Sequence, residues 1–236
     1  MADHSFDRAA YLTGVRAALP LAVPPAPFAM ALGIVIRESQ SVSTLAGWAS
    51  SWIIFAGSAQ LAALELLDDG ASIAVVVLTI AMINARHIVY SAAFSLRLGQ
   101  VPRWFRIIGS YLLIDQVFAV DEMQPPVLST RKRMWTFLGA ASVFWIVWNS
   151  FVVIGMTAGG FLPDDFPVNF IVAVLFASLM VLAIRNRPGI AAAIVGGFVA
   201  IVARDLPSGM NVVIAILCGA FVGATLETLG NRRATE

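Results

Sequence analysis

Long apolar runs fill most of this chain and confine its few charged residues to short clusters. The runs fall at roughly 17–36, 42–64, 71–96, 107–120, 134–157, 166–184, 189–203 and 210–229. Most of them reach the ~17–25 residues that an α-helix needs to span a bilayer. Since the apolar residues are continuous rather than alternating with polar ones, they indicate helices and not the strands of a barrel. The predicted fold is an all-α, polytopic integral membrane protein.

Composition excludes an ordinary soluble domain. Of the 236 residues, 59% are hydrophobic and 12% are charged, and the mean hydropathy is +0.86. Soluble domains have about 25% charged residues, so lipid is the expected solvent here. The net charge of +1 gives no reason to expect nucleic acid as a partner. Two histidines and one cysteine are too few for a metal site, so we expect neither a metal nor another cofactor.

Basic residues predict the topology, because cytoplasmic loops are enriched in Lys and Arg. They place both termini inside, whereas the acidic loops 65–70 and 158–167 look external. Six basic residues flank the run 107–120 on both sides, so this run is expected to be re-entrant, and the run 42–64 must then also fail to cross cleanly. These residues are Arg97, Arg103, Arg106, Arg131, Lys132 and Arg133. The alternative is eight ordinary crossings that break the charge rule.

We therefore expect about six full crossings plus two irregular or re-entrant helical segments. The chain divides into a cytoplasmic N-terminal segment at 1–16, a single transmembrane permease domain at 17–230 and a cytoplasmic tail at 231–236. Glycines at spacing four, Gly155 with Gly159 and Gly219 with Gly223, predict close packing between helices of this domain.

The first apolar run carries a proline cluster, Pro24, Pro25 and Pro27, which is followed by Phe28. Because proline lacks a backbone donor and clashes with the preceding turn, this helix is expected to break. Broken helices at membrane depth line cavities, and in transporters they often build the substrate site. A proline kink without function is the alternative.

Polar groups interrupt two further runs, Asn84, Arg86 and His87 in one and Asp115 with Gln116 in the other. A charge at the bilayer centre costs at least ~2.5–3.5 kcal/mol, so such groups usually face a cavity and serve a pathway. Arg86 suits a carboxylate, unless it reaches back to the interface, and His87 could carry a proton. Asp115 either neutralises Arg86 or binds a coupling proton. At 100° per residue along a helix, Asn84 and His87 share one face.

A third polar stretch contains Gly57, Ser58 and Gln60. Glycine lets a backbone open toward a zwitterion, and the Gln60 amide could assist, although tight helix packing explains Gly57 and Ser58 equally well. Ser58 and His87 could instead form the dyad of an intramembrane hydrolase. No recognisable nucleophile or oxyanion motif supports that chemistry.

Four stretches, in this order, resemble the AzlC family, the large subunits of bacterial branched-chain amino acid exporters. They are Pro24–Phe28, Phe55–Gln60, Asn84–Tyr90 and Ile114–Ala119. The resemblance covers nearly the whole chain and is clearest over 15–120. It implies a bacterial inner-membrane protein that acts with a small AzlD-type membrane subunit and exports valine, leucine, isoleucine or methionine. One departure is Gln116, where the family often has glutamate.

These residues together predict a gradient-driven permease subunit rather than an enzyme. Arg86 would hold the substrate carboxylate, with Gln60 and Asn84 assisting and with Gly57, Ser58 and His87 nearby. Asp115, followed by Gln116, would balance Arg86 or relay a proton, and Phe28 with the broken first helix would close over the apolar side chain. A non-transporting assembly subunit is the second hypothesis, and the hydrolase is the third.

Overall fold

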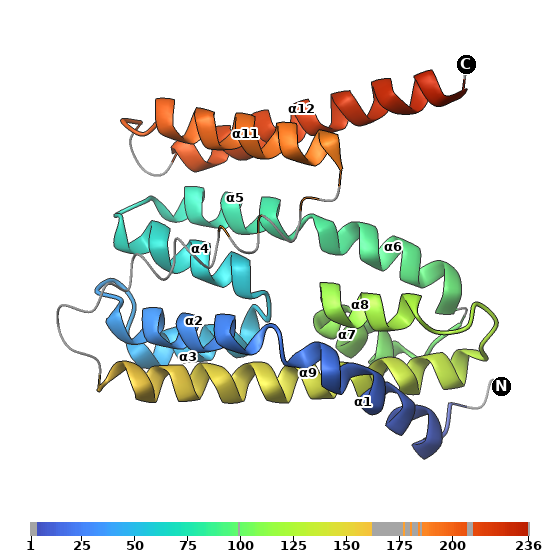
Figure 1. Cartoon of the computed structure of the whole chain (residues 1–236). Coiled ribbons are helices and arrows are strands. Elements are labelled where there is room, and N and C mark those ends of the chain that lie inside the picture. The colour runs from blue at the N-terminus through green and yellow to red at the C-terminus, as the bar shows by residue number, and fades with distance from the viewer. Residues whose placement is uncertain are drawn as a thin grey trace. The chain divides into compact units, whose positions relative to one another are not determined.

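The computed structural model describes residues 4–98, 100–161, 186–206 and 210–235, together with three single positions at 177, 180 and 184. Within these residues, every regular element is helical (Figure 1). Three helical stretches are long and apolar enough to cross a membrane, and one bent pair of helices adds a fourth candidate. They are Ile73–Leu98, which includes a turn at Ala85, Thr130–Gly159 and Met210–Gly230. The chain is thus a helical membrane protein, as its composition predicts, and the six crossings stay a prediction. The run 166–184 lies outside the described residues, apart from the single positions.

The first eight helices form four consecutive pairs, and each pair is interrupted within an apolar run. The pairs are α1 (Arg8–Ala22) with α2 (Ala26–Glu38), α3 (Thr44–Ile53) with α4 (Gly57–Asp68), α5 (Ile73–Asn84) with α6 (Arg86–Leu98), and α7 (Arg103–Leu112) with α8 (Asp115–Glu122). The second helices begin at residues 26, 57, 86 and 115, which are 29 to 31 residues apart. Each of the four polar or proline-rich stretches therefore lies at the start of a helix.

The interruptions have different local causes. Between α1 and α2, Pro24 and Pro25 remove two helical donors, and the two helix axes differ by 70°. Between α3 and α4, Phe55 adopts a φ of 41°, a left-handed conformation that costs a non-glycine residue roughly 1–2 kcal/mol. Between α5 and α6 there is only a turn at Ala85, and no proline or glycine nearby predicts it from the sequence.

This turn lies between two residues that the sequence places on one face. Asn84 ends α5, whereas Arg86 and His87 begin α6, all within the candidate span Ile73–Leu98. The runs 42–64 and 107–120 are likewise two helices each rather than one. Both are irregular in this sense, and whether they cross the membrane or re-enter stays a prediction.

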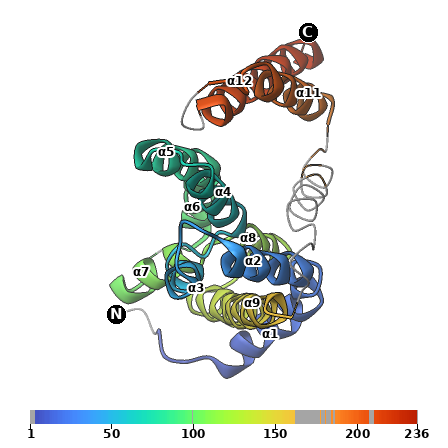
Figure 2. The ribbon, with the colours of Figure 1, turned by 90° about the vertical axis from the view of Figure 1, so that its left-hand side faces the viewer.

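The described residues form two compact units, and the first lies within residues 4–39, 43–61 and 83–161. Its central element is α9 (Thr130–Gly159), which runs along both α1 and α2 (Figures 1 and 2). A Cβ added to Gly14 would lie 1.9 Å from the Thr136 carbonyl oxygen, and one added to Gly155 would lie 1.9 Å from the Met30 carbonyl oxygen. The backbone of α9 is therefore in close contact with α1 on one side of the proline break and with α2 on the other. In this way α9 packs against both helices of the bent pair.

Aromatic and aliphatic side chains of α6, α7, α8 and α9 form the core of this first unit. Phe94 stacks on Phe137 with ring centroids 4.8 Å apart, and Phe105 meets the same ring edge-on at 5.6 Å. Val117 of α8 is fully buried in the same cluster. The short helices α7 and α8 are therefore fixed against α9, and α8 carries Asp115 at its first residue.

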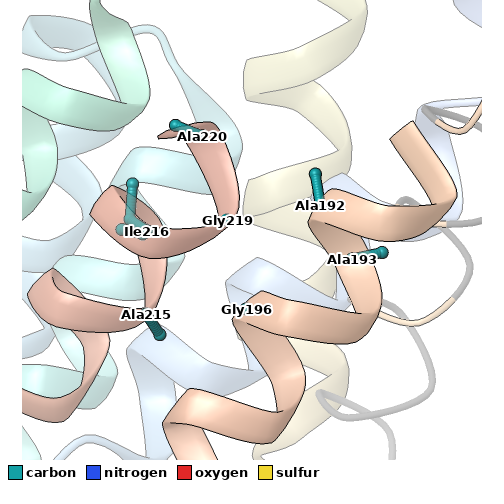
Figure 3. A pocket seen from close by; sticks show the side chains of 7 residues that line it. All are labelled: Ala192, Ala193, Gly196, Ala215, Ile216, Gly219 and Ala220. Carbon is teal, nitrogen blue, oxygen red and sulfur yellow. The ribbon is translucent and has the colours of Figure 1, made fainter. Parts of the chain in front are cut away.

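The second unit lies within residues 40–42 and 62–82 and the described residues beyond 163. Here α11 (Arg187–Val202) and α12 (Met210–Thr235) lie side by side. A shallow recess of about 300 Å³ between them is lined only by alanine, glycine and isoleucine residues (Figure 3). A Cβ on Gly219 would lie 2.9 Å from the Ala192 carbonyl oxygen, so this glycine is part of an internal packing face, as predicted.

Candidate functional site

Arg86 joins three of the helices that begin at a break. Its Nη1 donates to Asp115 Oδ2 over 2.8 Å, and its Nη2 donates to Ser58 Oγ over 3.1 Å. Ser58 is the second residue of α4, Arg86 is the first of α6 and Asp115 is the first of α8. Three stretches that are up to 57 residues apart in sequence thus meet at one guanidinium, within the first unit.

The helix dipole makes this arrangement asymmetric. An anion in the first turn of a helix is favourable and a cation there is unfavourable, each by roughly 0.3–1 kcal/mol. Asp115 is therefore well placed at the start of α8, whereas Arg86 at the start of α6 needs a counter-charge. The 2.8 Å contact with Asp115 supplies one, and an ion pair between these residues is one of the two roles that the sequence allows for Asp115.

His87 and Tyr90 extend the contact between α6 and α8. His87 Nε2 lies 3.9 Å from Asp115 Oδ1, which is too long for a hydrogen bond. Tyr90 stacks on Phe118 with ring centroids 4.8 Å apart and planes 16° from parallel. Ser58 Oγ accepts from Arg86 Nη2, and the described part of the chain has no hydrogen bond between Ser58 and His87.

The ring of Phe28, a residue of α2, lies against Gly57 at the start of α4. A Cβ on Gly57 would come within 2.3 Å of the Trp148 ring and within 2.9 Å of the Phe28 ring. These two rings also contact each other, with centroids 5.7 Å apart. Because Gly57 has no side chain, the rings of Phe28 from α2 and Trp148 from α9 can pack directly against the start of α4, next to Ser58 in the sequence.

Gln60 has a different set of neighbours from the one the sequence suggested. Its amide nitrogen lies 3.1 Å from the Gly47 carbonyl oxygen, 2.7 Å from Ser50 Oγ and 2.8 Å from Ser51 Oγ. The side chain is fully buried, and it ties α4 back to α3. Among the described residues, it makes no hydrogen bond with Arg86, so it supports the break rather than extending the Arg86 cluster.

Asn84 and Gln116 flank the charged pair in sequence, and both are half-buried. The Asn84 side-chain oxygen is buried and has no hydrogen-bond partner among the described residues. Two atoms of the pair itself, Arg86 Nε and Asp115 Oδ1, are in the same condition. Among the residues that the structure describes, no group of three or more His, Cys, Asp or Glu side chains could hold a metal ion.

Sequence reasoning missed a hydroxyl that braces the break between α3 and α4. The Tyr111 hydroxyl donates to the Trp52 carbonyl oxygen in the last turn of α3, and it accepts from Trp145 Nε1 over 2.9 Å. The last carbonyls of a helix lack partners within the helix, so this hydroxyl satisfies one of them. The only signal in the sequence was an amphipathic α7 that carries a tyrosine.

Sequence reasoning also missed a second arginine–aspartate pair. Arg133 Nη1 donates to Asp121 Oδ1 over 2.7 Å, and Arg133 Nη2 reaches the carbonyl oxygens of Pro125 and Pro126. These side chains are 1% and 3% exposed, whereas Arg86 and Asp115 are 39% and 37% exposed. Arg133, which the sequence assigned to a cytoplasmic basic cluster, is therefore part of a sealed structural pair, and Arg86–Asp115 is the accessible one.

A match to a known protein family covers the part of the chain that contains these site residues. The family model described as AzlC protein matches residues 20–162, which contain Phe28, Ser58, Arg86 and Asp115. The chain belongs to the AzlC family. α11 and α12 lie beyond the matched residues.

Two relatives extend the AzlC likeness along nearly the whole chain. The inner membrane protein YgaZ of Escherichia coli (strain K12) is 25% identical over 222 residues, which cover 89% of this chain and 88% of that protein. An uncharacterized membrane protein of Archaeoglobus fulgidus is 27% identical over 221 residues, which cover 92% and 95% of the two chains. No solved structure matches. Family and relatives together support a role in membrane transport.

Proposed function

We propose that this chain is the large subunit of a gradient-driven exporter for hydrophobic L-amino acids such as valine, leucine, isoleucine and methionine. It acts with a small AzlD-type membrane subunit in the bacterial inner membrane, with its N-terminus in the cytoplasm. Membership of the AzlC family supports the class of activity. The accessible Arg86–Asp115 pair, at the junction of three broken helices, supports the location of the substrate site.

That ion pair is the observation that carries the proposal. A lone charge in an apolar helix is costly, and a pair that served packing alone would be expected to be sealed, as Arg133–Asp121 is. Arg86 and Asp115 are instead each more than one-third exposed, and α4, α6 and α8 all begin beside them. Irregular backbone at membrane depth is tolerated where it lines a cavity.

Each residue then has a role in binding. Arg86 holds the substrate carboxylate, because its planar group matches a carboxylate bidentately. Asp115 balances Arg86, and Ser58 orients the guanidinium through its 3.1 Å hydrogen bond. Phe28, backed by Trp148 across Gly57, receives the apolar side chain. Asn84, His87 and Gln116 surround the charged pair, while Gln60 holds the break that carries Gly57 and Ser58.

Substituting Arg86 by lysine tests the proposal, because lysine keeps the charge and loses the bidentate geometry. A charge-assisted hydrogen bond is worth roughly 1.5–3 kcal/mol, so the apparent affinity should fall about 10- to 150-fold. The measurement is flux of leucine from loaded proteoliposomes that contain this chain and the small subunit, over a concentration series. Arg97→Lys is the matched control, because Arg97 lies on the same helix, is 37% exposed and also pairs with an acid.

Normal affinity in a well-assembled Arg86→Lys variant would mean that the carboxylate is held elsewhere. Flux from the small subunit alone, at the rate of the complete pair, would instead indicate that this chain only supports assembly. Liposomes with each chain alone therefore belong in the same experiment.

A further inference from the structure

We infer that the site recognises an α-amino acid by both of its charged ends. Arg86 takes the carboxylate on its Nε–Nη2 edge, and Asp115 Oδ1 together with Asn84 Oδ1 takes the α-ammonium. This inference rests on the proposed function and adds two elements to it. It assigns the ammonium pole, and it explains how the site would reject analogues that lack an amino group.

The free hydrogen-bonding edge of Arg86 is the first observation. Nη1 is occupied by Asp115 at 2.8 Å, whereas Nη2 contacts only the Ser58 hydroxyl and Nε has no partner among the described residues. In a guanidinium, Nε–H and one Nη2–H point along the same edge, which is one of the two forks that bind a carboxylate bidentately. Because Nη2 carries two hydrogens, a carboxylate on that edge can share Nη2 with the Ser58 hydroxyl, and it leaves the contact with Asp115 in place.

The second observation is a set of unused acceptors on Asp115 and Asn84. Asp115 Oδ1 and Asn84 Oδ1 are buried and lack a hydrogen-bond partner in the described part of the chain. His87 Nε2, at 3.9 Å from Asp115 Oδ1, is too distant to satisfy it. Asn84 precedes Arg86 by two residues, and Asp115 already touches the same guanidinium. The structure therefore leaves an unused oxygen on the carboxylate that contacts Arg86 and another on the amide two residues before Arg86. An α-amino acid presents the complementary groups, three ammonium hydrogens for these acceptors and a carboxylate for the guanidinium.

Charge balance gives the third argument. Arg86 and Asp115 sum to zero, and a zwitterion adds no net charge, so the loaded site stays neutral. The 2-oxo acid of the same carbon skeleton would leave one negative charge uncompensated, and the corresponding amine would leave one positive charge. An uncompensated charge in a poorly hydrated site is costly.

The sealed pair shows why unused atoms alone do not define this site. Asp121 Oδ2 and Arg133 Nε also lack hydrogen-bond partners among the described residues. Those side chains are at most 3% exposed, and Arg97 Nη1 lies 3.5 Å from Asp121 Oδ2. The Arg86 and Asp115 side chains are 39% and 37% exposed, although Arg86 Nε and Asp115 Oδ1 are themselves buried, so a ligand has an approach to this pair that Arg133–Asp121 lacks.

The test is equilibrium binding of labelled leucine and of its labelled 2-oxo acid to the complex of this chain with its small subunit in lipid nanodiscs. 3-Methylbutan-1-amine serves as the competitor that lacks a carboxylate. Wild type should favour leucine over either analogue by at least about 10-fold, the value of one charge-assisted contact. Asp115→Asn removes the counter-charge of Arg86, so it should move the ratio of leucine to 2-oxo acid binding toward the 2-oxo acid by at least about 10-fold.

Glu122→Gln is the matched control, because Glu122 lies on the same helix, is 42% exposed and pairs with Arg97. It should leave the ratio unchanged. Asn84→Ala adds no charge and covers the case in which Asp115→Asn does not fold. Asn84→Ala should weaken leucine binding and leave binding of the 2-oxo acid unchanged.

The outcomes separate the inference from the proposed function. Leucine binding to wild type without preference over the 2-oxo acid overturns the inference alone, as does an unchanged ratio in a folded Asp115→Asn or Asn84→Ala variant. Failure of wild type to bind leucine overturns the proposed function, and the inference with it.

Discussion

Two arginine–aspartate contacts in this chain have nearly the same length and very different surroundings. Arg86–Asp115 measures 2.8 Å and is more than one-third exposed, whereas Arg133–Asp121 measures 2.7 Å and is almost completely buried. The energy of an ion pair depends on what replaces water around it rather than on its length. The buried pair is therefore expected to hold α8 against α9, and the exposed pair is where we propose that ligand binds.

At the residue scale, charge removal should affect the two pairs differently. Arg133→Gln should destabilise the protein by at most about 3–5 kcal/mol, because it leaves the buried Asp121 with only the longer 3.5 Å contact to Arg97. Arg86→Gln and Asp115→Asn should each cost less, because both side chains are more than one-third exposed and the charge left behind is less completely desolvated than that of Asp121. The Arg86→Gln/Asp115→Asn double variant should cost less than the sum of the two single variants. Thermal unfolding in detergent and membrane abundance measure this series, and additive losses would show that Arg86 and Asp115 are not coupled.

At the element scale, the helix interruptions bring distant stretches of the chain together. In each of the four pairs, the second helix begins at a polar or proline-rich stretch. The first turns of α4, α6 and α8 come together at Arg86. The α3–α4 interruption is braced from three directions. Gln60 ties it to α3, the Tyr111 hydroxyl binds the Trp52 carbonyl oxygen, and Trp148 packs into the space beside Gly57.

Gly57→Ala tests the packing of this interruption. The added methyl would lie 2.3 Å from the Trp148 ring, so Trp148 or the start of α4 must move, at a cost of typically about 1–3 kcal/mol. We expect a lower unfolding temperature and weaker leucine binding, because Ser58 moves with α4. Trp148→Phe removes the outer ring atoms that clash, so it should restore part of both losses. Gly197→Ala is the control, since nothing lies within 4 Å of its Cβ position, and both properties should stay at the wild-type level.

At the scale of the whole molecule, the charge distribution predicts topology. Acidic residues dominate the segment 65–70 and basic residues flank the run 107–120 on both sides, so that run should return to the side it left. α7 and α8 have 10 and 8 residues, and each is too short to span a bilayer alone.

Single cysteines test this topology in a Cys218→Ser background. Gln100→Cys and Ser129→Cys should both be shielded from an impermeant thiol reagent in intact cells, and Asp69→Cys should react as the external control. Permeabilised cells should label all three variants, which checks that each thiol is accessible. Labelling of only one of the two flanking positions in intact cells would exclude a re-entrant run 107–120.

The sequence by itself determined the solvent, the class of secondary structure and the chemical character of the site. Long apolar runs leave helices in lipid as the available solution, and prolines at 24 and 25 forbid a continuous first helix. Arg86 and Asp115 were recognisable because unpaired charges are costly in lipid, so two opposite charges in neighbouring runs are expected to meet.

Only the tertiary structure decided which polar residues meet and which stay apart. The turn at Ala85 has no proline or glycine, and it separates Asn84 from the helix that carries Arg86. Gln60 hydrogen-bonds residues of α3, and Arg133 is buried although it lies in a basic cluster. Local sequence cannot specify these outcomes, because burial and hydrogen-bond partners come from helices that are distant in sequence. Two arginines of identical chemistry thus differ in role because α8 and α9 enclose one of them and leave the other open.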